Sequence, residues 1–217
     1  MNILLAGGTG VIGQALLDQC AGSAHEIITV GRRPTGRVTQ DIVADFSNLP
    51  PLPSAETAIC LLGTTIGKAG SQKAFRAVDH GAVMSFANAA KACGTRHFLI
   101  VTAVGANPSS TVFYSRVKGE VEHDLCTLGF DRLDIMQPGL LRGPRAETRP
   151  VETLLKSVAP LADLVMRGPW RRYHSVHKNV VARSLLQACK HPAPGVFKHQ
   201  YDDICRFAHE FKLTRKD

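Results

Sequence analysis

A glycine-rich stretch near the start of the chain, GGTGVIG at Gly7–Gly13, constrains the fold more than any other feature. It follows an apolar run, Asn2–Ala6, that is typical of a buried strand, and it leads into Val11–Cys20, which is typical of a helix. Glycines at this spacing let the backbone turn tightly, approach a pyrophosphate and pack the helix closely on the strand. The free N–H groups at the start of the helix would bind the anion. The stretch therefore predicts a dinucleotide-binding unit.

The rest of the chain continues to alternate short apolar runs with helical segments. This alternation is typical of βαβ units and predicts a parallel sheet covered by helices on both faces. We expect an α/β, doubly wound Rossmann fold in one domain, 1–217, with a core over about 1–140 and a C-terminal substrate-side segment over about 141–217. The expected strands are 2–6, 26–30, 41–44, 58–62, 97–105, 132–137 and 196–198, and the expected helices are 11–20, 71–93, 112–128, 151–165, 179–190 and a last one to about 211.

Composition and cysteine usage exclude several classes of protein. Hydrophobic residues make up 44% and charged residues 20%, which is typical of a globular protein, and no apolar run is long enough to span a bilayer. The N-terminus lacks the basic region of a signal peptide. Six cysteines without a CxxC pair predict buried free thiols, so we expect a cytoplasmic protein. His174 and His177 have no cysteine or carboxylate at ligand spacing, and we expect no metal.

The net charge of +8 raises the question of an anionic partner. The basic residues form three short clusters, at 31–37, 142–149 and 167–172, and no nucleic-acid recognition motif accompanies them. We therefore expect a small-molecule partner rather than nucleic acid or a membrane. The sequence leaves open whether the protein is a monomer or a homodimer.

The end of the second expected strand, ITVGRRP, indicates which dinucleotide would bind. A carboxylate at this place would bond the ribose 2′-hydroxyl of NAD, but the chain has Gly31 there, followed by Arg32 and Arg33. Guanidinium groups bind a 2′-phosphate by charge-assisted hydrogen bonds, whereas a carboxylate would repel it. The pattern favours NADP(H) over NAD(H), and the alternative is a pair of solvated arginines in a turn.

The stretch YSRVKGE places Tyr114 and Lys118 four residues apart, on one face of an expected helix. A carbonyl that accepts hydride needs a proton, which a phenol beside an ammonium group can deliver. Thr102 ends the preceding expected strand, and its hydroxyl could position the substrate oxygen. Such spacing also arises by chance on a solvated helix, but its place in a nucleotide-binding sheet favours a catalytic pair.

Three motifs together, GGTGVIG, VTAVGAN and YSRVKGEVE, resemble the short-chain dehydrogenase/reductase superfamily. Three longer stretches, LLGTTIGKAGSQKAF, YSRVKGEVE and FDRLDIMQPGLLRGPRAETRP, resemble most closely its atypical Tat-interacting-protein-like NAD(P)H-binding oxidoreductases. The motifs sample residues 7 to about 150. This resemblance implies that Tyr114 is the acid/base, that Lys118 assists it and binds the nicotinamide ribose, and that Thr102 stands where serine is common.

The resemblance also implies a set of cofactor contacts that spans the carboxyl ends of several strands. Asp45 and Phe46 would flank the adenine, and Pro138 and Gly139 would meet the nicotinamide. The full expected set is Gly7, Thr9, Gly10, Val11, Ile12, Gly13, Arg32, Arg33, Asp45, Phe46, Leu62, Gly63, Thr64, Tyr114, Lys118, Pro138 and Gly139.

The substrate side has weaker signals. Arg142, Arg145 and Arg149 could bind an anionic substrate, or they could form a solvated loop paired with Glu147 and Glu152. We expect an NADPH-dependent oxidoreductase that acts on a carbonyl or related small molecule. The alternative is an NADPH-binding regulatory or sensing protein with little catalytic activity, and turnover against a carbonyl panel distinguishes the two.

Overall fold

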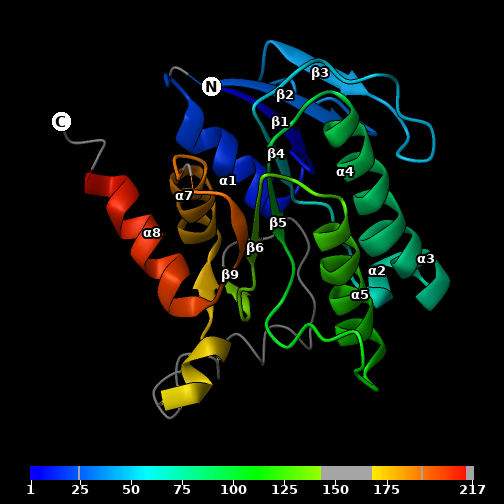
Figure 1. The fold of residues 1–217 in the computed structure, drawn as a ribbon, viewed down its shortest axis with the longest axis vertical. Helices are drawn as coiled ribbons and strands as arrows, with labels where there is room; N and C mark the ends of the chain where they lie inside the picture. Colours follow the sequence, from blue (N-terminus) through cyan, green and yellow to red (C-terminus); the bar gives the residue numbers. More distant parts are fainter. Residues whose placement is uncertain (24, 143–167, 192, 214–217) are drawn as a thin grey trace.

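The computed structural model describes residues 1–23, 25–142, 168–191 and 193–213, and its centre is a seven-stranded parallel sheet (Figure 1). The strand order is β3-β2-β1-β4-β5-β6-β9, so the chain moves outward from β1 first in one direction and then in the other. This topology confirms the expected doubly wound α/β fold. The strands are β1 (Asn2–Ala6), β2 (Glu26–Gly31), β3 (Gln40–Val43), β4 (Thr57–Cys60), β5 (His97–Val101), β6 (Arg132–Met136) and β9 (Gly195–His199).

Helices cover both faces of the sheet (Figure 1). One layer contains α1 (Val11–Cys20), α7 (Lys178–Ala188) and α8 (Tyr201–Leu213). The opposite layer contains α4 (Val83–Ala92) and α5 (Phe113–Thr127). In the part of the chain that the structure describes, no helix is long and apolar enough to cross a membrane. The smaller elements are α2 (Ile66–Ala69), α3 (Gln72–Arg76), a π-helical segment η1 (Ala77–Ala82), a 3₁₀ helix η2 (Gly168–Tyr173) and a pair of two-residue strands, β7 (Leu141–Arg142) and β8 (Val176–His177).

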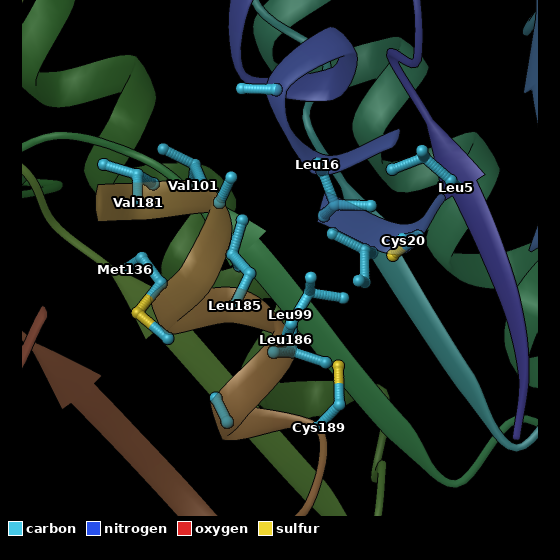
Figure 2. Close-up of a cluster of buried hydrophobic side chains, with 14 of the residues drawn as sticks. Leu5, Leu16, Cys20, Leu99, Val101, Met136, Val181, Leu185, Leu186 and Cys189 are labelled. Carbon is cyan, nitrogen blue, oxygen red and sulfur yellow. The ribbon is translucent and has the colours of Figure 1, made fainter. Parts of the chain in front are cut away.

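The alternation of side chains along each strand divides the core into two layers. Leu5 and Leu99 point toward α1 and α7, where they meet Leu16 and Leu185 (Figure 2). Their neighbours in sequence point to the other face, where Phe98 packs with residues of α4 and α5. The central strands β1, β4 and β5 are therefore mostly apolar, because both of their faces are covered, whereas the edge strands β3 and β9 have exposed positions.

Three expectations about individual elements need correction or qualification. The strand expected over 97–105 ends at Val101, because the chain turns at Ala103–Ala106 and Gly105 has a φ of 81°. The helix expected over 71–93 is interrupted by η1, where the backbone widens to π-helical geometry. The helix expected over 151–165 lies outside the described residues. The short helix α2 was not expected, although Thr65 caps its start and Gly70 ends it in the left-handed region.

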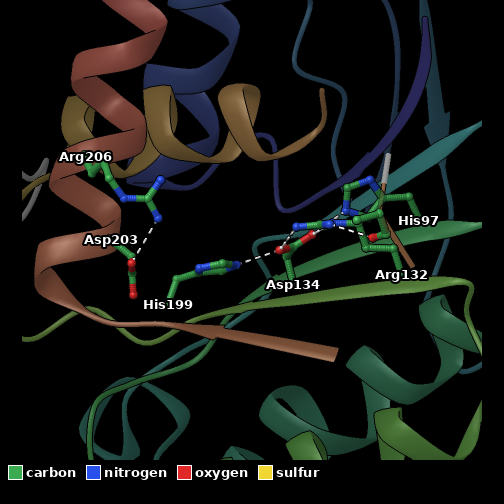
Figure 3. Close-up of polar contacts among 7 residues, drawn as sticks. His97, Arg132, Asp134, His199, Asp203 and Arg206 are labelled. Carbon is green, nitrogen blue, oxygen red and sulfur yellow. Dashed lines mark hydrogen bonds and ion pairs between the residues drawn. The ribbon is translucent and has the colours of Figure 1, made fainter. Parts of the chain in front are cut away.

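One charged group is completely buried in the sheet, the carboxylate of Asp134 on β6 (Figure 3). It is bonded to Nε2 of His97 and of His199, each at 2.6 Å, and to the guanidinium of Arg132 at 2.5 and 2.9 Å. Burial alone would raise the pKa of Asp134, but hydrogen bonds from His199, His97 and Arg132 outweigh it and hold the pKa well below its usual range. The cluster joins three neighbouring strands, since His97 begins β5, Arg132 begins β6 and His199 ends β9.

Candidate nucleotide site

The glycine loop between β1 and α1 can be formed only by small residues. Gly7 has a φ of 85°, and a Cβ there would lie 2.6 Å from the backbone of Leu61. A Cβ on Gly13 would lie 2.3 Å from the carbonyl oxygen of Gly7, so the first turn of α1 packs directly on the loop. Gly10 donates its N–H to the same oxygen at 2.9 Å. These contacts agree with the expected turn at Gly7 and the close packing at Gly13, whereas the approach of an anion to Gly10 stays a prediction.

A pocket opens beside this loop, at the carboxyl ends of β1 and β2. The expected contacts that it brings together come from the glycine loop, the arginine pair and two apolar side chains: Gly7, Thr9, Arg32, Arg33, Phe46 and Leu62. The sequence did not predict the other lining residues, which are Gly8, Thr29, Val30, Gly31 and Thr35. The remaining expected contacts do not line this pocket: Gly10, Val11, Ile12, Gly13, Asp45, Gly63, Thr64, Tyr114, Lys118, Pro138 and Gly139.

The two arginines of the pocket are exposed, and among the described residues neither guanidinium has a hydrogen bond or ion pair. Arg37, in the same basic cluster, differs from them because it contacts Asp18 at 2.5 Å and the carbonyl oxygen of Gln14 at 3.3 Å. Arg32 and Arg33 are therefore the members of this cluster whose charge is available to a ligand in the pocket.

Asp45 lies just beyond the pocket rather than in its wall. Its carboxylate accepts the N–H and the hydroxyl of Ser47, each at 2.8 Å. These two bonds, together with the charge of Arg32, lower the pKa of Asp45 below its ordinary value. Asp45 thus shapes the turn that carries Phe46, and a direct contact with adenine stays a prediction.

The expected catalytic pair lies on α5, on the side of the sheet opposite to α1. The ring of Tyr114 packs against Phe75 with 5.6 Å between centroids, and among the described residues none bonds to its hydroxyl. Lys118 is buried one turn further along the helix. Gly119, the next residue on α5, lets the helix pack closely on the loop after β5. A Cβ at this position would lie 2.2 Å from the backbone of Asn107 and Pro108.

The sequence did not predict the partner of Lys118, which is Asp79 on the π-helical segment η1. Asp79 is fully buried and its Oδ1 lies 2.8 Å from Nζ of Lys118. Its Oδ2 accepts the N–H of Thr64 at 2.8 Å, so one carboxylate joins α5 to the loop after β4. A π-helical turn is frequent at functional sites, but the sequence FRAVDHG alone does not show which helical residue would face the lysine.

The expected role of Thr102 as a substrate-positioning hydroxyl does not fit the structure. Thr102 is buried, and its hydroxyl donates to Oε1 of Glu122 at 2.6 Å. Alternation along β5 explains this placement, because Thr102 continues the face of Phe98 and Ile100, which α5 covers. Glu122 also accepts from Gln137 and Lys198, so the threonine fixes α5 against the ends of the strands.

The segment after β6 is held by contacts to the loop after β5 and to the C-terminal part of the chain. Pro138 accepts the N–H of Val104 at 3.1 Å, and a Cβ on Gly139 would lie 2.4 Å from the carbonyl oxygen of His174. Arg142 donates to the carbonyl oxygen of Ser175 at 3.3 Å. Arg145, like Arg149, lies outside the described residues, so the expected pair of substrate-binding arginines stays a prediction.

Comparison with known proteins identifies the family. The sequence matches the HIM1 family over residues 27–166. The chain belongs to this family. It is 34% identical over 207 residues to the protein fmp52, mitochondrial, of Aspergillus fumigatus, covering 86% of each chain. It is also 34% identical over 208 residues to the protein HTATIP2 of Rattus norvegicus, covering 89% of this chain and 83% of that one, which confirms the Tat-interacting-protein-like resemblance.

Solved structures with the same fold include nucleotide-binding proteins. The human epimerase family protein SDR39U1, solved with NADPH, has a TM-score of 0.66 at 22% identity, over 92% of this chain and 74% of that one. MoeE5, solved with UDP-glucose and NAD, has a TM-score of 0.71 at 14% identity, over 98% and 82% of the two chains. At these identities the likeness shows the fold alone.

The names of the relatives contradict the expected cytoplasmic location. Relatives from Aspergillus niger, Aspergillus fumigatus and Coccidioides immitis are each named as mitochondrial proteins. The expectation rested on cysteines, all six of which are free in the structure. Free thiols indicate a reducing environment without indicating which compartment supplies it, so that argument was too weak to assign a location.

Proposed function

We propose that this member of the HIM1 family binds NADPH and reduces a carbonyl or related small molecule, with Tyr114 as the acid/base. The observation that carries the proposal is the pocket itself, where the glycine loop lies beside two arginines that form no ion pair with any described residue. Support for a nicotinamide cofactor also comes from the structures of the same fold that were solved with NADPH and with NAD.

The residues present fit such a cofactor. The turn at Gly7 and the close packing at Gly13 hold the glycine loop directly before α1, whose first N–H groups could bind a pyrophosphate. Arg32 and Arg33 suit a 2′-phosphate, and Phe46 and Leu62 offer apolar surface to an adenine ring. A bound reduced nicotinamide would supply hydride to the substrate carbon.

The chain's own residues would supply the proton and would hold the catalytic groups in place. Tyr114 holds a proton at Oη and would deliver it to the substrate oxygen, which gains negative charge as the reaction proceeds. Lys118 would stabilise the phenolate that remains, while Asp79 fixes the ammonium group at 2.8 Å. Thr102 would act indirectly, by holding α5 through Glu122.

A second candidate function is an NADPH-binding regulatory protein with little catalysis. One observation favours it: two groups of the expected catalytic set already have internal partners, since Lys118 is paired with Asp79 and the hydroxyl of Thr102 with Glu122. Consumption of NADPH with a panel of aldehydes, ketones and quinones distinguishes the two functions. Turnover that Tyr114→Phe abolishes supports the enzyme, and NADPH binding without turnover on any member supports the regulatory protein.

The first expected result concerns cofactor preference. The double variant Arg32→Ala with Arg33→Ala should lose most of the preference for NADPH over NADH, because it removes both guanidinium groups from the pocket. Hydrogen bonds to charged groups contribute about 1.5–3 kcal/mol each, so NADPH affinity should fall on the order of tenfold or more. Isothermal titration calorimetry with both cofactors measures this.

Arg37→Ala is the matched control for that experiment, because it removes the same charge from the same loop. Its guanidinium already contacts Asp18 and Gln14, so its loss should change neither cofactor affinity by more than about twofold. Equal affinity of the unaltered protein for NADPH and NADH would contradict the cofactor assignment.

A further inference from the structure

The loop that carries the two arginines, residues 31–37, is bonded at Thr35 and Gly36 to one carboxylate of the sheet, that of Asp41 on β3. Asp41 accepts the N–H and the hydroxyl of Thr35 at 3.0 and 2.9 Å, and the N–H of Gly36 at 3.0 Å. It also accepts the hydroxyl of Thr29 on β2. Burial opposes ionisation, but the four hydrogen bonds, that of Thr29 first, lower the pKa of Asp41, so the carboxylate is ionised at neutral pH.

These bonds place the arginine loop against the glycine loop. The hydroxyl of Thr35 donates to Asp41 and also accepts the N–H of Arg37 at 3.3 Å, so its side chain has one orientation. In that orientation the methyl group of Thr35 lies over Gly8, 2.9 Å from where a Cβ would stand. Thr29 and Thr35, both bonded to Asp41, form part of the pocket wall beside Arg32 and Arg33.

We propose that Asp41 is a positioning residue for cofactor preference: it fixes the loop so that both arginines face the place of the 2′-phosphate before the cofactor binds. This inference rests on the proposed function. A loop that is already ordered loses less conformational freedom on binding, which increases affinity for the ligand that contacts it. NADPH would contact the loop through its 2′-phosphate, whereas NADH has only an uncharged hydroxyl group at that position. Loosening the loop should therefore weaken NADPH binding selectively.

The alternative is that Asp41 only stabilises the turn between β2 and β3. A purely structural role would lower thermal stability and weaken both cofactors by a similar factor. The ratio of the two dissociation constants separates these roles, because a general loss of folded protein cancels in it.

The test measures NADPH and NADH affinity by calorimetry for Asp41→Asn and Asp41→Ala, without any need for turnover. Asp41→Ala should weaken NADPH about tenfold and NADH less than about twofold, since it removes the acceptor of four hydrogen bonds. Asp41→Asn keeps one acceptor oxygen, so its NADPH affinity should lie between that of Asp41→Ala and that of the unaltered protein. Thr35→Val, which removes one donor and keeps the methyl group over Gly8, should have a smaller effect in the same direction and remains usable if the Asp41 variants fold poorly.

Two further variants complete the design. Asp203→Asn makes the same chemical change at an exposed ion pair with Arg206 on α8, and it should leave both affinities unchanged. Adding Asp41→Ala to the Arg32→Ala, Arg33→Ala protein should not change the NADPH-to-NADH ratio further, because Asp41 acts through those arginines.

The outcomes separate this inference from the function on which it rests. A preference that is lost in the arginine variant but kept in Asp41→Ala, Asp41→Asn and Thr35→Val overturns the role of Asp41 alone. Equal weakening of both cofactors assigns Asp41 a structural role and also overturns it. If the unaltered protein has no preference for NADPH, the cofactor assignment and the role of Asp41 are both wrong.

Discussion

Tyr114→Phe is expected to lower turnover by roughly 10²–10⁴-fold, the usual effect of removing a positioned acid or base. The change deletes only the phenolic oxygen, so the ring keeps its packing against Phe75 and the helix should be unaffected. Cofactor affinity should stay within about twofold, because the oxygen is assigned to the substrate. Steady-state kinetics with any active carbonyl compound, together with an NADPH titration, measures both effects. Tyr173→Phe, the same change at a tyrosine on η2, is the matched control and should retain activity.

Replacing Lys118 should change NADPH affinity as well as turnover, whereas replacing Tyr114 should change turnover alone. Lys118→Met should weaken both NADPH binding and turnover, because the ammonium group is assigned to the ribose and to the phenolate. The variant also leaves the Asp79 carboxylate buried without its partner at 2.8 Å, so its stability must be measured beside its activity. The double variant with Asp79→Asn removes that unpaired charge. If it restores stability without restoring NADPH affinity, the lysine binds the cofactor; full recovery of affinity would contradict that role.

A turnover rate for Tyr114→Phe equal to that of the unaltered protein would show that the catalytic assignment is wrong. Normal NADPH binding by the tyrosine and lysine variants, with no substrate found, would instead favour the regulatory function.

The largest expected effect on stability comes from Asp134. Asp134→Asn should lower the free energy of unfolding by roughly 3–5 kcal/mol, because it leaves Arg132 and two histidines around a neutral amide in the buried sheet. The guanidinium of Arg132 also donates to Ala193 at 2.6 Å and lies 4.2 Å from the ring centroid of Phe197, so it cannot turn to solvent without losing those contacts. Urea unfolding followed by circular dichroism at pH 7 measures the difference.

Asp131→Asn is the matched control, since it changes the same type of residue immediately before the same strand. Asp131 bonds to Arg96 at 2.7 Å, but both side chains are half exposed or more, so this pair should contribute less than about 1 kcal/mol. Similar losses in the two variants would contradict a special role of the buried cluster.

The Asp134 cluster also predicts how stability depends on pH. The folded-state pKa of Asp134 lies below the value of about 3.9 expected in the unfolded chain, so its contribution to stability is fully present above that value. The contribution is lost as the pH falls from about 4 toward the folded pKa. The stability difference between the unaltered protein and Asp134→Asn should therefore be large at pH 7 and should shrink below pH 4. A difference that is constant over this range would show that the carboxylate charge is not responsible.

Sequence patterns predicted the sheet well because the central strands, such as β1, β4 and β5, are buried on both faces and are therefore mostly apolar. The glycine loop was predictable for a related reason, since backbone contacts at Gly7 and Gly13 exclude other residues. The ends of elements were less predictable: β5 stops at Val101, although the apolar pattern continues, because the chain turns at Ala103–Ala106.

The charged partners of the site could not be predicted from spacing. Asp79 meets Lys118 from an element 39 positions earlier in the chain, and Asp41 on β3 bonds both to the preceding arginine loop and to Thr29 on the adjacent strand β2. Each is an ordinary acidic residue in its local sequence, and only the folded chain places it beside its partner. Thr102 was assigned to the substrate for the same reason, because its partner Glu122 is 20 residues away on α5.

A crystal structure of the protein with NADPH would test the proposed function most directly. It should show the pyrophosphate at the N-terminus of α1, the 2′-phosphate in contact with Arg32 and Arg33, and the nicotinamide ring directed toward Tyr114. A cofactor bound away from the glycine loop, or a 2′-phosphate that contacts neither arginine, would contradict it.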